Sequence, residues 1–204
     1  MVATAEGFYR RKTQDNLDFY PTPPWATRAL FRYILGDYTY LNYSAFEPAC
    51  GNGHISEVLK TQFRQVQSLD IECRDYFDAR VGDYFQTTVE PPYNDWIITN
   101  PPFSLANRFI LKAINEAQIG VAMFCRLSLL EGANRYKTIF VETPPTIVAP
   151  FVERVTLIKN KVTKKRCSTT AYAWFVWYIH NMESTKIVWI PPCKKELEKD
   201  SDYA

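Results

Sequence analysis

The sequence has little of several features that mark other classes of protein. Two of its 204 residues are histidines, and its five cysteines include no C-x-x-C pair, so we expect no metal site. No apolar run approaches the roughly 20 residues that a transmembrane helix needs, and no apolar signal segment opens the chain. An odd cysteine count without such a segment predicts a protein of the reducing cytoplasm that has no membrane partner.

The sequence also lacks an excess of charge. Its 24 basic and 22 acidic residues leave a formal net charge of +2, so a surface that binds nucleic acid must be local. Seven glycines and 47% hydrophobic residues argue against disorder and fibrous repeats. We expect a single domain over residues 1–204, with flexible termini at 1–17 and 194–204, as a monomer or homodimer.

Apolar runs alternate between strand and helix patterns along the first two thirds of the chain. Thr22 is expected to cap a helix that has Pro23 at its first position. Further helices are expected after residue 53, with apolar spacing up to Phe63, and around residues 106–113. Strands are predicted at 43–47, 66–70, 96–99 and 120–124. This order predicts a parallel sheet covered on both faces. Three later runs, 147–158, 170–180 and 187–190, predict antiparallel strands at one edge.

A glycine turn lies where the first strand gives way to a helix. Gly51 and Gly53 let backbone N–H groups approach a ligand at a helix start, although such a turn can also serve only to bend the chain. Ser56 stands where a dinucleotide-binding loop has its third glycine, which favours a ligand without pyrophosphate.

Three acidic residues surround this turn in the sequence. Asp70 follows about 20 residues later at a strand end, where an acid can bind ribose hydroxyls. Asp83 comes after the next expected strand. Glu47, just before the turn, suits the amino group of a ligand better than a phosphate. A helix-capping or surface role for Glu47 and Asp70 stays open.

The tetrapeptide Asn100-Pro101-Pro102-Phe103 follows the apolar strand expected at 96–99. Ligands bind at this end of the strands in open α/β sheets. The two prolines stiffen the turn and leave the Asn100 side-chain oxygen and the Pro101 carbonyl as fixed acceptors for an –NH2 group. Phe103 offers a face for a flat base. The pattern favours transfer of a group to an amino or amide nitrogen.

With these motifs the chain resembles the class I S-adenosylmethionine-dependent amino-methyltransferases, and in particular small phage- and prophage-type DNA N6-adenine methyltransferases. The resemblance runs from about residue 18 to 180. It implies a Rossmann-like fold with a mostly parallel seven-stranded sheet, antiparallel strands at the C-terminal edge and helices on both faces. It implies a catalytic turn at Asn100, Pro101, Pro102 and Phe103. The cofactor residues that it implies are Tyr20, Thr22, Pro23, Glu47, Pro48, Ala49, Cys50, Gly51, Asn52, Gly53, Asp70, Ile71, Asp83, Tyr84 and Asn100.

The resemblance implies an activity as well. The expected enzyme takes S-adenosylmethionine, releases S-adenosylhomocysteine, uses no metal, and methylates N6 of a flipped adenine in DNA. Because relatives that select one sequence commonly add a recognition domain, we expect weak or loop-encoded specificity. The alternatives are an RNA methyltransferase acting on guanine N2 or adenine N6, and a protein-glutamine N-methyltransferase. A non-enzymatic nucleic-acid-binding or anti-restriction module is the least favoured. The expected location is the cytoplasm, of the host if the gene is a phage's.

A local cluster of basic residues is a candidate surface for binding nucleic acid, although the net charge of the whole chain is small. Its members are Lys159, Lys161, Lys164, Lys165 and Arg166. Such a run between two expected strands can neutralise phosphates of DNA or RNA, or can be a solvated hairpin. Arg126 and Arg135 are candidates for phosphate or structural contacts, and the sequence does not separate these roles.

Overall fold

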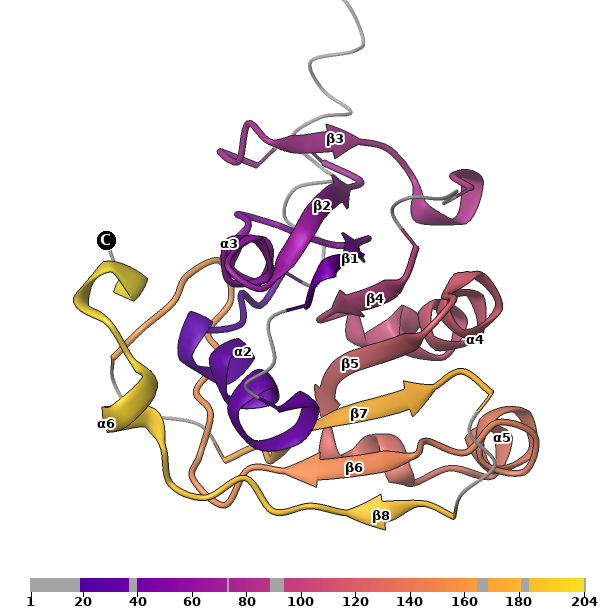
Figure 1. Cartoon of the computed structure of the whole chain (residues 1–204). Coiled ribbons are helices and arrows are strands. Elements are labelled where there is room, and N and C mark those ends of the chain that lie inside the picture. Colours follow the sequence, from indigo (N-terminus) through magenta and orange to yellow (C-terminus); the bar gives the residue numbers. More distant parts are fainter. Residues whose placement is uncertain are drawn as a thin grey trace, which may run out of the picture.

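The computed structural model describes residues 19–36, 40–72, 74–88, 94–164, 169–180 and 184–203. They form one eight-stranded sheet with helices on both faces (Figure 1). The strands are β1 (Tyr40–Glu47), β2 (Phe63–Asp70), β3 (Ala79–Val81), β4 (Trp96–Thr99), β5 (Gly120–Arg126), β6 (Ile147–Pro150), β7 (Tyr172–Tyr178) and β8 (Lys186–Ile187). The helical segments are α2 (Pro24–Leu30), η1 (Phe31–Leu35), α3 (His54–Lys60), η2 (Tyr84–Gln86), η3 (Phe103–Leu105), α4 (Ala106–Glu116), η4 (Leu127–Leu130), α5 (Ala133–Arg135), η5 (Tyr136–Phe140), α6 (Lys194–Leu197) and η6 (Asp200–Tyr203).

The strand order is β3-β2-β1-β4-β5-β7-β6-β8. The first five of these strands are parallel, β7 runs antiparallel to both β5 and β6, and β8 pairs in parallel with β6. The predicted α/β class, the mostly parallel sheet and the antiparallel pairing at its C-terminal edge are confirmed. The run expected as an antiparallel strand over 187–190 instead gives β8, which ends at Ile187 and pairs in parallel with β6. The sheet has eight strands rather than seven, because the two-residue strand β8 adds to the edge at β6.

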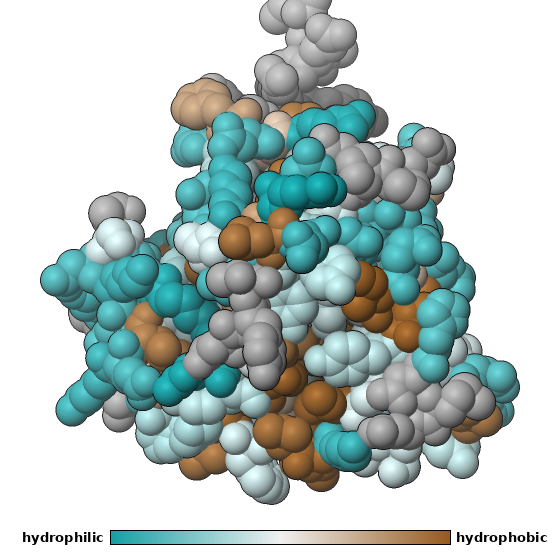
Figure 2. Space-filling model, in the orientation of Figure 1, coloured by the Kyte–Doolittle hydropathy of each residue, from teal (hydrophilic) through white to brown (hydrophobic). Residues whose placement is uncertain are grey.

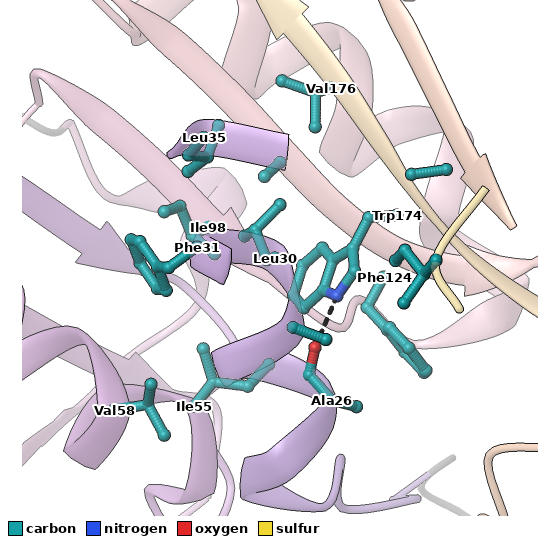
Figure 3. Packing of buried hydrophobic residues seen from close by; sticks show 14 of the residues in the cluster. Ala26, Leu30, Phe31, Leu35, Ile55, Val58, Ile98, Phe124, Trp174 and Val176 are labelled. Atoms are coloured by element: carbon teal, nitrogen blue, oxygen red, sulfur yellow. Dashed lines mark hydrogen bonds between the residues drawn. The ribbon is translucent and has the colours of Figure 1, made fainter. Parts of the chain in front are cut away.

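Two hydrophobic cores fill the space between the sheet and its helices. Successive residues of β7 point to opposite faces: Trp174 packs in the core under α2, η1 and α3, while Phe175 packs in the core under α4. The indole Nε1 of Trp174 donates a hydrogen bond of 2.9 Å to the carbonyl of Ala26 in α2 (Figure 3). Strand β4 lies between β1 and β5 and is buried along its whole length, as its unbroken apolar run predicts.

Several local expectations are corrected by the structure. Helix α2 begins at Pro24, its N-cap is Pro23, and no side chain caps it. Thr22 therefore is not the cap, and its buried hydroxyl has no hydrogen-bond partner among the described residues. Phe63 begins β2 instead of continuing the helix before it. The run expected as a strand over 147–158 is a strand only over Ile147–Pro150.

The C-terminal segment is folded where a flexible end was expected. Residues 194–203 form α6 and η6, and Asp202 is buried in an ion pair with Arg28 of α2. The ammonium group of Lys194 donates a 2.9 Å hydrogen bond to the carbonyl of Lys164. The outer surface of this segment, at the left of Figure 2, is mostly hydrophilic. The other expected flexible end, 1–17, lies outside the described residues. None of the described helices has both the length and the apolar character to cross a membrane.

Candidate active site

A cavity of about 470 Å³ opens at the carboxyl ends of β1, β2 and β4. The predicted site residues that line it are Tyr20, Thr22, Glu47, Pro48, Ala49, Cys50, Asp70, Ile71, Asp83, Tyr84, Asn100, Pro102 and Phe103. The predicted residues that do not line it are Pro23, Gly51, Asn52, Gly53 and Pro101. The structure thus brings together the acidic groups and the tetrapeptide, which are far apart in the sequence.

The glycine turn is held by the strand beside it. The N–H of Cys50 donates to the carbonyl of Leu69 at 3.0 Å, and the N–H of Gly51 donates to Oδ2 of Asp70 at 2.8 Å. The Gly51 N–H that the sequence assigned to a ligand is therefore taken by Asp70. The carboxylate of Asp70 fixes the turn and also faces the cavity.

Both glycines of the turn are required by backbone conformation and by close packing. Gly51 has φ +54° and Gly53 has φ +78°, in the left-handed region that favours glycine. A Cβ on Gly51 would lie 2.2 Å from a ring carbon of Phe19, and one on Gly53 would lie 2.5 Å from the ring of Tyr76. The glycines let these two rings lie against the backbone, and of the two rings that of Phe19 belongs to a residue that lines the cavity.

Asp70 is the centre of a small charged network. Its Oδ1 accepts the N–H of Glu72 at 3.0 Å and lies 3.6 Å from Nε of Arg74. The Arg74 guanidinium also lies 4.2 Å from the centre of the Phe19 ring. Arg74 lines the cavity, and the sequence did not single it out. Its position four residues after Asp70 is the signal that could have found it.

Glu47 ends β1 with its side chain almost completely buried, at 1% exposure. Its carboxylate accepts a hydrogen bond from the Ser56 hydroxyl, which in turn lies 2.6 Å from the hydroxyl of Ser68. Burial raises the pKa of Glu47 to about 8, against the lowering effect of Ser56, and the charge of Asp70 raises it further. A cationic group of a ligand is the partner that such a carboxyl lacks.

Asp83 and Tyr84 stand where β3 leads into η2. One carboxylate oxygen of Asp83 accepts the N–H of Phe85 at 2.9 Å and so caps η2. Tyr84 is 2% exposed, and its hydroxyl donates to Glu116 at 2.9 Å. Tyr84 therefore offers the cavity its ring and not its hydroxyl. The neighbouring Arg108, another lining residue that the sequence did not single out, lies 3.9 Å over the Phe85 ring.

The Asn100 amide is fixed in one orientation. Its Nδ2 donates a 2.8 Å hydrogen bond to the carbonyl of Tyr20. Because a carbonyl oxygen can only accept, this contact assigns the nitrogen of the amide and places Oδ1 on the other side. Oδ1 is buried and has no hydrogen-bond partner among the described residues. An acceptor of this kind, in a residue that lines the cavity, is prepared to receive an N–H donor.

Aromatic rings surround the tetrapeptide. The Phe103 ring lies 5.4 Å from the ring of Tyr20, tilted by 30°, and 6.3 Å from the ring of Tyr172 on β7. Tyr172 in turn stacks on Phe124 at 5.3 Å with an angle of 11° between the rings. These rings provide flat apolar surface beside Asn100, of the kind on which a base can stack.

The first part of the predicted basic cluster, around residue 160, is connected to a residue that lines the cavity by one backbone hydrogen bond. Lys159 and Lys161 flank Asn160, which has φ +65° and whose N–H donates to the carbonyl of Phe19 at 3.0 Å. Lys164 forms a 2.9 Å ion pair with Asp200 at the surface, so part of its charge is neutralised. Lys165 and Arg166 lie outside the described residues.

Comparison with known proteins reveals a shared fold. No protein-family model matches the chain, and no curated protein matches it. The methyltransferase subunit of a type I restriction-modification system from Streptococcus thermophilus superposes with a TM-score of 0.60 at 12% identity, over 92% of this chain and 50% of that one. The modification subunit of an enzyme classed provisionally as a type I restriction enzyme, from Vibrio vulnificus YJ016, gives 0.58 at 12%, over 98% and 53%.

A smaller protein from Pyrococcus horikoshii, classed provisionally as an RNA methyltransferase, superposes with a TM-score of 0.55 at 19% identity, over 80% of this chain and 88% of that one. The chain thus spans about half the length of the two restriction-system subunits. Together with the strand order, these similarities give the chain the Rossmann-like fold of the class I methyltransferases.

Proposed function

We propose that the protein is an S-adenosylmethionine-dependent methyltransferase that acts on N6 of adenine in DNA. The observation that carries the proposal is the Asn100 amide, whose nitrogen is held by the Tyr20 carbonyl while its buried oxygen is unpartnered among the described residues. Hydrogen bonding of a target amino group to Oδ1 holds that group in place and favours a tetrahedral nitrogen, whose lone pair is then available for in-line attack.

The residues of the cavity fit the cofactor. The buried Glu47 carboxyl suits the cofactor's α-amino group, and the remaining lone pairs of Asp70 suit its ribose hydroxyls. Asp83 and the ring of Tyr84 are then left for its adenine. S-adenosylmethionine supplies an electrophilic methyl group on a sulfonium sulfur. The chain itself binds and orients the two reactants and excludes water.

The turn at residues 159–161, called the basic turn below, and the aromatic rings support a nucleic-acid substrate. Lys159 and Lys161 flank Asn160, whose N–H donates to the carbonyl of Phe19, a residue that lines the cavity. The rings of Phe103, Tyr20 and Tyr172 provide stacking surface for a base that has left its helix. A protein glutamine needs neither feature. Among nucleic acids, DNA rests on the resemblance of the motifs, and RNA is the second candidate because a protein of the same fold is assigned to RNA.

The test supplies the protein with labelled cofactor and, separately, unmethylated DNA, RNA and a glutamine-containing peptide. We expect label in DNA, recovered as N6-methyladenine after digestion to nucleosides. Label in RNA or peptide but not in DNA would overturn the DNA assignment.

The role of Asn100 is tested by Asn100→Ala, which removes the acceptor. We expect turnover to fall by roughly 100-fold or more while the cofactor still binds. Asn42→Ala, at an exposed position in β1, is the matched control and should leave turnover unchanged. Near-normal turnover of Asn100→Ala would remove the amide from the mechanism.

A further inference from the structure

Arg126 is the last residue of β5 and stands at the same edge of the sheet as the catalytic turn. The six residues before it in the strand are buried, whereas Arg126 is exposed. Strand β5 pairs in parallel with β4, with Met123 opposite Thr99. Arg126 therefore emerges beside the chain segment that carries Asn100 and Phe103.

The guanidinium of Arg126 is held on an aromatic surface. It lies 4.0 Å from the centre of the Phe103 ring, within the range of a cation–π contact. Across the antiparallel pair, Arg126 is opposite Tyr172. Burial raises the pKa of Tyr172, and the nearby Arg126 charge acts in the opposite direction. The ring of Phe103, which lines the cavity, and the neighbouring Tyr172 thus position this cation beside the tetrapeptide.

Arg126 lacks the acidic partner that two other arginines of the described chain have. Arg28 pairs with Asp202, and Arg74 pairs with Asp70 and Glu72. Among the residues that the structure describes, Arg126 forms no ion pair with a carboxylate. The charge of its guanidinium is therefore not neutralised by a carboxylate of the described chain.

Arg135, the other arginine whose role the sequence left open, has a structural role. Its Nε donates to Oδ1 of Asn107 at 3.1 Å, and its terminal nitrogen donates to the carbonyls of Ser128, at 3.1 Å, and Glu131. These bonds tie α5 to α4 and η4. The structure therefore separates two residues that are alike in the sequence.

We propose that Arg126 is a positioning residue that binds a backbone phosphate next to the nucleotide whose base enters the site at Asn100. The inference rests on the proposed function and narrows its substrate to a nucleic acid. A guanidinium matches two phosphate oxygens in a bidentate arrangement. Seated on Phe103, it links the position of the backbone to the ring on which the base stacks. A glutamine-bearing protein has no phosphate to offer at this place.

The test compares Arg126→Gln, which removes the charge, with Arg126→Lys, which keeps the charge and loses the planar fork. Binding of fluorescently labelled duplex and single-stranded DNA is measured by anisotropy from low to high salt, and methyl transfer is measured in parallel. For Arg126→Gln we expect Kd and KM for DNA to rise roughly tenfold or more. The slope of log Kd against log salt should fall by about 0.9 for duplex or about 0.7 for single strands. Arg126→Lys should restore the slope but only part of the affinity.

Two controls make the result specific. The cofactor Kd of each variant should match that of the wild type, which shows an intact fold. Arg135→Gln removes the same charge at an arginine that binds Asn107, Ser128 and Glu131. This variant should leave the slope of log Kd against log salt unchanged. An unchanged salt slope and KM in Arg126→Gln would overturn the inference while leaving methyl transfer to DNA standing. Arg126-dependent DNA binding without any methyl transfer would overturn the proposed function and leave the phosphate contact standing.

Discussion

The buried carboxyl of Glu47 is expected to make both stability and cofactor binding depend on pH. Its side chain is 1% exposed, and burial raises its pKa from 4.5 to about 8. Each tenfold change in an ionisation constant corresponds to about 1.4 kcal/mol. Ionising Glu47 in the folded protein is therefore harder than in the unfolded chain by about 5 kcal/mol, because 3.5 such steps separate 4.5 from 8.

The sign of the effect follows from which state holds the proton more tightly. Because the folded pKa lies above the unfolded one, Glu47 contributes its full stabilisation below about pH 4.5. This contribution falls as the pH rises and is lost once the pH passes about 8. Glu47→Gln is neutral at every pH and resembles the protonated side chain in shape.

The assay is urea unfolding followed by tryptophan fluorescence at intervals from pH 5 to pH 9, for the wild type and Glu47→Gln. We expect the free energy of unfolding of the wild type to decline relative to the variant over this range, by several kcal/mol at most. Parallel curves for the two proteins would refute the reasoning, since they would mean that Glu47 ionises alike in both states.

Cofactor binding provides a second measurement of the same group. An ammonium group beside Glu47 favours the carboxylate, so binding near pH 7 should release up to about one proton. Calorimetry in buffers of different ionisation enthalpy measures this release. Glu47→Gln should release none and should bind the cofactor more weakly.

Two further predictions concern packing in the sheet. Gly120→Ala would place a Cβ 2.5 Å from the ring of the buried Trp96, and we expect the free energy of unfolding, measured with heat or urea, to fall by roughly 1–3 kcal/mol. The control is Gly82→Ala, whose Cβ would have its nearest neighbour atom at 3.2 Å. A loss for Gly120→Ala no larger than that for Gly82→Ala would contradict this prediction. Trp174→Phe leaves the Ala26 carbonyl without its indole donor and should lower the free energy of unfolding by roughly 1–3 kcal/mol. The control is Trp189→Phe, which should change stability little because Trp189 is 65% exposed.

The sequence predicts the inner part of the sheet well because its signals there are local. The buried run of β4 and the apolar spacing of α4 each identify their element without help from the rest of the chain. The C-terminal segment could not be predicted in the same way. This segment is held against α2 by the ion pair between Arg28 and Asp202. The two residues are 174 positions apart in the sequence, so no local pattern indicates that they pair. The helical turns from 127 to 140 were missed because they are short and change type within a few residues.

In the site, too, the features with a local sequence signal could be predicted, and those that depend on distant contacts could not. The sequence places Glu47, Asp70 and Asn100 in one region because each ends or directly follows a strand, and a parallel sheet gathers strand ends at one edge. The sequence does not show that Gly51 gives its N–H to Asp70, nor that Thr22 is left without a helix to cap. Phe63 was misplaced because a residue at 3% exposure fits the buried face of a strand as well as that of a helix.

The short segment at Phe19 and Tyr20 connects the parts of the site to one another. The Tyr20 carbonyl holds the Asn100 amide, the Phe19 carbonyl holds the basic turn at Asn160, and the Phe19 ring lies against Gly51. A displacement of this segment would release all three contacts together. Any ligand that moved this segment would therefore be expected to alter the Asn100 amide and the turn at Asn160 at the same time.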